Sequence, residues 1–260
     1  KDKNVIVMGL GVDDPKGVFG TTLNLHKKFP KNRVFDLPTS ENSFTGFALG
    51  LSLQGKKPVI VHQRVEFSLL SMDQIINQAA KWLYMSGGKS NVPLVIRLII
   101  GRGWGQGPQH SQSLETLFAH IPGLKVVVPS NPYDAKGLLI QSIRDNDPVI
   151  FLENKMLYDV EGEVPDQSYT IPFAEANVIR EGKDALIVAI GRMVDLSIKA
   201  AEKLANEGIQ CSILDPRTLS PIDEELLLDM VDECGRLVIV DESYPRCSIA
   251  SDISSLVAEK

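Results

Sequence analysis

The sequence predicts an α/β protein made of two domains, each built on a parallel sheet that helices cover. Two observations predict this class. Short apolar runs alternate with helical segments along most of the chain, as in parallel sheets with helices on both faces. The alternation stops once, after Asn154, where Pro and acidic residues become frequent. We therefore expect a first domain at residues 1–160, a linker at 161–180 and a second domain at 181–260, which ends inside an expected helix and is expected to be incomplete.

The strands are expected where aliphatic and β-branched residues form short runs between turn residues. The run Leu94–Ile100 is nearly continuous, which indicates a buried strand. In chain order the expected strands are Val5–Met8, Arg33–Phe35, Pro58–His62, Leu94–Ile100, Leu124–Val128, Val149–Glu153, Ala185–Ala189, Gln210–Leu214 and Leu237–Val240.

The helices are expected between these strands, and capping residues mark several of their ends. Ser40 and Glu41 form a helix start with a hydroxyl cap and a first-turn acid, Pro132 fits a first helical turn, and Gly55 fits a helix end. The expected helices are Thr22–Phe29, Asn42–Leu53, Phe67–Tyr84, Ser111–His120, Pro132–Ile143, Val194–Asn206, Asp223–Asp232 and Ser248–Lys260.

Composition excludes several classes of protein. The net charge is −6 without an acidic or basic block, which argues against a nucleic-acid partner. No apolar run approaches the roughly 20 residues that span a bilayer, and the first residues lack the layout of a signal peptide. The three widely spaced cysteines indicate reduced thiols, and no His or Cys spacing indicates a metal site.

One stretch carries most of the unusual residues. The strand Leu94–Ile100 opens into a loop with glycine at every second position, Gly101–Gly107, and the loop leads to His110. A buried strand that ends in such a loop is a usual place for chemistry in α/β proteins. The loop is not a dinucleotide fingerprint, because that motif would need glycine at Gln106 or Pro108.

The chain resembles the beta subunit of the thiamine-diphosphate-dependent, decarboxylating component of 2-oxo acid dehydrogenases of the pyruvate, branched-chain and acetoin type. The resemblance rests on RVFDLPTSENSFTGFALG, MDQIINQAAKWLYMSGG, QHSQSLETLFAHIPGLKVVVPSNPYDAKGLL and DPVIFLENKMLY in the first domain, and on DPRTLSPIDEELL and GRLVIVDE in the second. It covers nearly the whole chain. It implies a pyrimidine-binding, transketolase-like domain followed by a transketolase C-terminal domain.

The resemblance also implies a division of labour between two chains. The family holds Mg²⁺ and the cofactor diphosphate with a Gly-Asp-Gly motif, which this sequence lacks. The Mg²⁺ and the diphosphate are therefore expected on an alpha subunit. The expected partners are that alpha subunit, a second beta subunit in an α2β2 assembly, and a lipoyl acyltransferase. The expected compartment is the cytoplasm, or the mitochondrial matrix in a eukaryote.

Three residues match the family's active-site positions. Glu41 matches the glutamate that bonds a pyrimidine nitrogen of thiamine diphosphate, and burial against the cofactor would raise its pKa. Phe67 matches the aromatic residue that packs on the pyrimidine ring. His110 matches the family's active-site histidine, and histidine is the residue type best suited to proton transfer at physiological pH. Without the resemblance, these residues would be read as a first-turn acid, a core aromatic residue and a helix-entry histidine.

Three further residues are weaker candidates for contact with the substrate. His62 ends an expected strand that points toward the same pocket. Arg102 and Trp104 lie where the family has a different loop sequence, and an arginine there suits a carboxylate or phosphate. A surface arginine is the equal alternative for Arg102.

Two enzymatic functions remain open at this point. The first is oxidative decarboxylation of a 2-oxo acid with acyl transfer to a lipoyl domain, active only with an alpha subunit. The second is a split transketolase-like enzyme that transfers a carbon fragment to an aldehyde or sugar acceptor, which the altered loop favours. A regulatory subunit without activity is the third, and the retention of Glu41, Phe67 and His110 argues against it.

Overall fold

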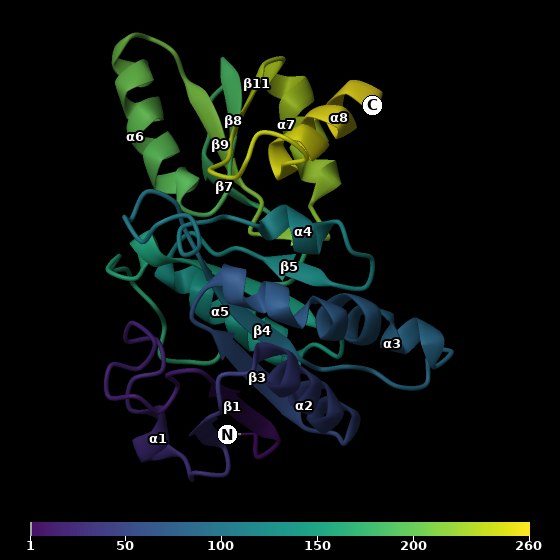
Figure 1. Cartoon of the computed structure of the whole chain (residues 1–260). Coiled ribbons are helices and arrows are strands. Elements are labelled where there is room, and N and C mark those ends of the chain that lie inside the picture. The colour runs from purple at the N-terminus through teal and green to yellow at the C-terminus, as the bar shows by residue number, and fades with distance from the viewer. Residues whose placement is uncertain (1) are drawn as a thin grey trace.

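The computed structural model describes residues 2–260 and contains two sheets with helices packed on them (Figure 1). The larger sheet has seven strands in the order β10-β5-β6-β4-β3-β1-β2, and the smaller has four in the order β11-β8-β9-β7. Neighbouring strands are parallel except at one edge of each sheet, where β10 and β7 run antiparallel to β5 and β9. The α/β prediction with two mainly parallel sheets is confirmed.

Most strands of the larger sheet follow the predicted apolar runs closely, but the short edge strand β10 was not predicted. Strand β4 is buried along its whole length, because parallel strands between two helical layers have no solvent face. The strands are β1 (Val5–Gly9), β2 (Val34–Asp36), β3 (Lys57–His62), β4 (Val95–Ile100), β5 (Lys125–Val127), β6 (Val149–Asn154) and β10 (Thr218–Ser220).

The helical segments of the first domain differ more from the prediction. The expected helix Phe67–Tyr84 is three successive segments: a 3₁₀ helix η1, a π-helical stretch η2 and a short α-helix α3. The segments are α1 (Leu25–Lys28), α2 (Glu41–Leu53), η1 (Val65–Ser71), η2 (Asp73–Ala79), α3 (Ala80–Met85), α4 (Glu115–Ala119), α5 (Pro132–Arg144) and η3 (Lys155–Leu157).

Helix α4 is shorter than the predicted helix Ser111–His120. The carbonyl of Gln112 accepts a hydrogen bond from the Gly101 N–H, 3.1 Å away, and the Ser113 hydroxyl donates to Glu242 of the second domain at 3.2 Å. These contacts hold the residues before α4 outside the helix, so tertiary structure overrides local preference here.

The second domain contains an edge strand that the sequence analysis missed. Strand β7 lies inside the range 161–180 that is predicted to be linker, and it pairs antiparallel with β9, with a register shift between Val178 and Arg180. The elements of the second domain are β7 (Asn177–Arg180), β8 (Ala185–Ala189), α6 (Met193–Asn206), β9 (Cys211–Asp215), α7 (Glu224–Cys234), β11 (Leu237–Val240) and α8 (Ile249–Glu259).

One large hydrophobic cluster extends across both domains. Val126 and Val128 of the first domain belong to the same buried cluster as Leu214 and Leu219 from the second. Strand β10 strengthens this junction, because it belongs to the second half of the chain but pairs with β5 of the larger sheet. In residues 2–260, no helix is both long and apolar enough to span a bilayer.

Candidate active site

The candidate residues follow three parallel strands of the larger sheet. Glu41 comes after β2, Phe67 after β3 and His110 after β4. Strands β2, β1, β3 and β4 are all parallel, so their carboxyl ends meet at one edge, where ligands of open α/β sheets usually bind. The fold therefore delivers all three side chains to the same edge.

Glu41 is the first residue of α2 and is only 7% exposed. The expected Ser40 cap does not form, because the Ser40 hydroxyl donates to the hydroxyl of Ser43, 2.9 Å away. The helix dipole favours an acid at this position. Among residues 2–260, no donor forms a hydrogen bond with the Glu41 carboxyl group. A buried carboxyl group with free acceptor capacity is suited to a ligand that donates a hydrogen bond.

Phe67 and His110 contact each other. Their ring centroids are 5.2 Å apart and the rings meet edge to face at 79°. Phe67 lies on η1, and α2, which carries Glu41, is fastened to the end of η1 by a hydrogen bond from Thr45 Oγ1 to Ser71 Oγ at 3.0 Å. Phe67 and His110 are therefore in direct contact, and Glu41 lies on the neighbouring helix.

His62 lies in the core rather than on the surface of this edge. It is 0% exposed, and its ring centroid is 4.8 Å from that of Phe44 on α2. Neither ring nitrogen has a hydrogen-bond partner within residues 2–260. Burial lowers the pKa of His62 to about 3. His62 is therefore a neutral core side chain with two unsatisfied polar atoms, which is costly for a folded protein.

We expect His62→Phe to stabilise the protein, and more so in acid. Phenylalanine keeps the ring against Phe44 and removes the unsatisfied nitrogens, a gain of about 1–2 kcal/mol at pH 7.5. Because the folded pKa lies below the unfolded value near 6.5, the stability that neutral His62 contributes is lost as pH falls below 6.5 toward 3. The advantage of the variant should grow by about 2 kcal/mol at pH 5.

Urea unfolding at pH 7.5 and pH 5 measures this difference, with His120→Phe as the control because His120 is exposed. An advantage that is the same at both pH values would contradict the assignment of His62 as a buried neutral histidine.

Trp104 packs inside a cluster of aromatic and cationic side chains. The Arg64 guanidinium lies 4.6 Å from the Trp104 ring centroid and 4.8 Å from that of Phe19. Lys155 lies 5.0 Å from the Phe19 centroid. These cation–π contacts fix the middle of the glycine-rich loop against the segments that follow β1, β3 and β6.

Arg102 reaches the second domain. Its Nη1 donates to the carbonyl oxygens of Glu242 at 2.8 Å and Ser243 at 3.2 Å, and its guanidinium lies 5.3 Å from the Tyr244 ring centroid. The sequence predicts a substrate contact for Arg102. In the structure its donors serve the junction between the domains.

Buried and half-buried acids lie at the same junction, and no pattern in the sequence predicts them. Burial and the neighbouring Asp241 raise the pKa of Glu115 to about 8, and burial also raises the pKa of Glu242. Glu115 and Asp241 are far apart in the chain, so no local motif predicts that they meet. Within residues 2–260, no group of three or more His, Cys, Asp or Glu side chains is arranged to hold a metal ion.

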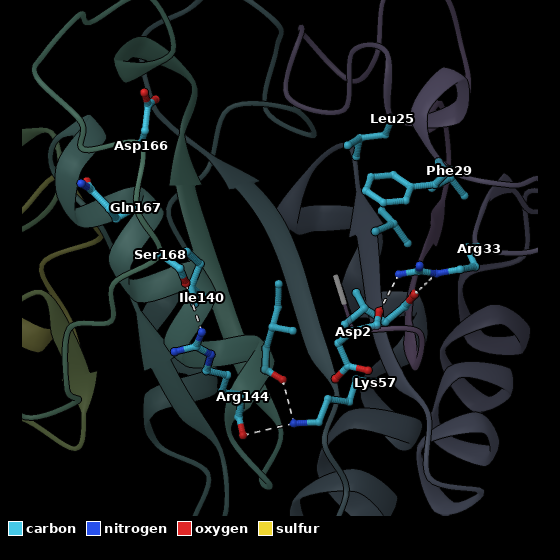
Figure 2. Close-up of a pocket in the computed structure, with 14 residues that line it drawn as sticks. Asp2, Leu25, Phe29, Arg33, Lys57, Ile140, Arg144, Asp166, Gln167 and Ser168 are labelled. Atoms are coloured by element: carbon cyan, nitrogen blue, oxygen red, sulfur yellow. Dashed lines mark hydrogen bonds between the residues drawn. The ribbon is translucent and has the colours of Figure 1, made fainter.

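A cavity of about 770 Å³ lies elsewhere, between the β1–β2 side of the sheet, α1 and α5 (Figure 2). One of its cations, Lys57, already has partners, since Lys57 Nζ donates to the carbonyls of Ile143 and Arg144 at 3.1 and 3.2 Å. None of the candidate site residues is among those that line this cavity.

Comparison with known proteins gives matches along the chain. The model of the transketolase pyrimidine-binding domain matches residues 1–161, and that of the transketolase C-terminal domain matches residues 174–260. The beta subunit of acetoin:2,6-dichlorophenolindophenol oxidoreductase from Cupriavidus necator is 52% identical, over 98% of this chain and 76% of its own length. The pyruvate dehydrogenase E1 component subunit beta of Bacillus subtilis is 44% identical, over 100% of this chain and 80% of its own length.

A solved structure agrees on the fold. The protein described as "split gene transketolase, inactive beta4 tetramer" superimposes with a TM-score of 0.83, over 100% of this chain and 79% of that one. Its sequence identity is 24%, so this likeness concerns the fold alone.

Proposed function

The chain belongs to the transketolase-like family that includes the beta subunits of acetoin and pyruvate dehydrogenases, and we propose that it is such a beta subunit, acting with thiamine diphosphate and an alpha subunit on a 2-oxo acid or acetoin. The observation that carries the proposal is the contact between Phe67 and His110, beside the helix that begins at the buried Glu41.

The three side chains fit a thiamine ring by their chemistry. Glu41 has a buried carboxyl group with free acceptor capacity, which suits a pyrimidine ring nitrogen that carries a proton. Phe67 is half-buried and offers an aromatic surface for that ring. When bound, thiamine diphosphate supplies a nucleophilic carbon that adds to a carbonyl group. Glu41 would hold the ring in its proton-accepting form, and His110 would donate or hold a proton beside Phe67.

The diphosphate and Mg²⁺ are assigned to the alpha subunit. Mg²⁺ requires oxygen ligands, and the chain has no Gly-Asp-Gly motif. The surface beside Phe67 supports a partner there, because Leu69 and Leu70 on η1 are 41% and 66% exposed. Exposed neighbouring leucines next to a candidate site are typical of an interface between subunits.

We expect Leu70→Asp to weaken association with the alpha subunit at least tenfold while the chain stays folded, because a charge would have to be buried at the interface. Co-purification and analytical ultracentrifugation of the mixed chains measure the assembly. Leu196→Asp is the matched control, since Leu196 on α6 is 43% exposed but lies in the second domain. Equal assembly by both variants would remove η1 from the proposed interface.

Reconstitution tests the function itself. The chain is mixed with an alpha subunit that carries Gly-Asp-Gly, together with thiamine diphosphate and Mg²⁺. The substrates are acetoin and a panel of 2-oxo acids. Two products are measured: a reduced artificial acceptor and an acylated lipoyl domain. No turnover with any of these substrates would contradict the proposal. Transfer of a two-carbon unit to an aldehyde instead would identify a split transketolase-like enzyme.

A further inference from the structure

The loop that leads to His110 has little internal structure of its own. Gly103, Gly105 and Gly107 have φ angles of 76°, 76° and 75°, a conformation that favours glycine. Glycine also loses more conformational entropy on folding than other residues, so ordering this loop is costly. Backbone hydrogen bonds hold its ends, from Gly101 N–H to Gln112 at 3.1 Å and from His110 N–H to Gly107 at 3.3 Å. Contacts from outside the loop must therefore define its position.

The second domain supplies such contacts through four residues after β11, Asp241–Tyr244, which we call the clasp. On one side of the loop, Arg102 donates to two carbonyl oxygens of the clasp, those of Glu242 and Ser243. On the other side, the Tyr244 hydroxyl donates to Gln112 Oε1 at 3.2 Å. The clasp thus contacts the loop both before and after His110.

The Glu242 side chain lies at the centre of these contacts. Its Oε1 accepts hydrogen bonds from Ser113 Oγ at 3.2 Å and from the side-chain amide of Asn154. Arg192 Nη1 lies 3.8 Å from its other oxygen. Asn154 in turn packs beside Gly101, where an added Cβ would lie 3.4 Å from Asn154 Oδ1. One carboxylate therefore connects both ends of the loop with the second domain.

We propose that the clasp positions His110, with Glu242 and Arg102 as positioning residues for the reaction. The inference rests on the proposed function, because it assigns the second domain a part in the geometry of that same site. The charged Arg102 donates to backbone carbonyls of the clasp before His110. After His110, Ser113 donates to the Glu242 carboxylate and is separated from His110 by only two residues.

The fluorescence of Trp104 reports the conformation of the loop, so this test does not depend on enzyme activity. The chain has two tryptophans, so Trp82→Phe leaves Trp104 as the sole tryptophan, whose emission is excited selectively over that of the tyrosines. In that background, Glu242→Ala should shift Trp104 emission to the red and lower its anisotropy, because the loop leaves the Arg64 and Phe19 contacts. Cleavage by trypsin after Arg102 should become about tenfold faster, since the loop opens more often.

Two further variants separate positioning from general stability. Glu242→Gln keeps an acceptor oxygen for Ser113 and Asn154 and should restore most of the wild-type emission and cleavage rate. Glu225→Ala removes an exposed acid of the same domain and should change neither. A Gln variant as impaired as the Ala variant, or an Ala variant with unchanged emission and cleavage, would overturn the proposal.

Kinetics of the enzyme reconstituted from alpha and beta subunits test whether the clasp affects catalysis. Glu242→Ala should lower kcat by roughly 10- to 100-fold through displacement of His110, while the KM for thiamine diphosphate stays near wild type. If the wild-type enzyme turns over none of the substrates, the proposed function fails, and Trp104 emission still decides on the clasp.

If Glu242→Ala does not fold, Arg102→Met replaces it, because Arg102 is an exposed loop residue. The same red shift is expected, and its absence would overturn the proposal.

Discussion

Glu41→Gln should lower turnover of the reconstituted enzyme by about 10²- to 10⁴-fold and leave the fold unchanged. Glutamine preserves the size of the side chain at the start of α2, but an amide cannot exchange a proton with a pyrimidine nitrogen. Substrate turnover with saturating thiamine diphosphate and Mg²⁺ measures the loss. Circular dichroism and the unfolding midpoint verify that the variant is folded.

The same variant also tests the alternative reading of Glu41 as a first-turn acid that stabilises α2. In that case the substitution would cost about 0.3–1 kcal/mol of stability and leave turnover intact. Glu224→Gln is the matched control, because Glu224 is an exposed acid in the first turn of α7. Survival of turnover in Glu41→Gln would remove Glu41 from the cofactor site.

The strands of the larger sheet were largely predictable, since buried parallel strands appear in the sequence as apolar runs. The prediction Leu94–Ile100 differs from β4 (Val95–Ile100) by one residue. The missed strands β7 and β10 have only four and three residues, lie at sheet edges and run antiparallel. Short edge strands contain too few apolar residues to produce a periodic signal.

The candidate site was predictable only in part. The resemblance indicated Phe67 and His110, but no spacing rule predicts that their rings meet at 5.2 Å. The role of Arg102 could not be predicted from its local sequence. An arginine in a glycine-rich loop suggests an anionic ligand, yet its hydrogen-bond acceptor lies 140 residues further along the chain. Contacts between domains leave no local pattern, and so the clasp had no signal in the sequence.

A buried ion pair at the domain junction carries the largest expected effect on stability. Arg217 Nη2 lies 2.9 Å from Asp134 Oδ1, and their side chains are 11% and 1% exposed. Arg217→Met would leave the Asp134 carboxylate buried without its cation, at a cost of about 3–5 kcal/mol. Urea unfolding at pH 8 measures this loss, and Arg236→Met, an exposed arginine of the second domain, should change stability by less than about 0.5 kcal/mol.

The pH dependence of this loss provides a second, independent test, because another buried acid lies beside Arg217. Burial raises the pKa of Asp215 to about 7, and the charge of Arg217 opposes that rise. A carboxyl group with a raised folded pKa contributes stability that is present below its unfolded value near 3.9 and is lost as pH rises through the folded value. Without Arg217 the charged form of Asp215 is less favourable, so the deficit of the variant should be largest at pH 8 and should shrink toward pH 5. A deficit independent of pH would mean that Arg217 stabilises the junction by packing rather than by its charge.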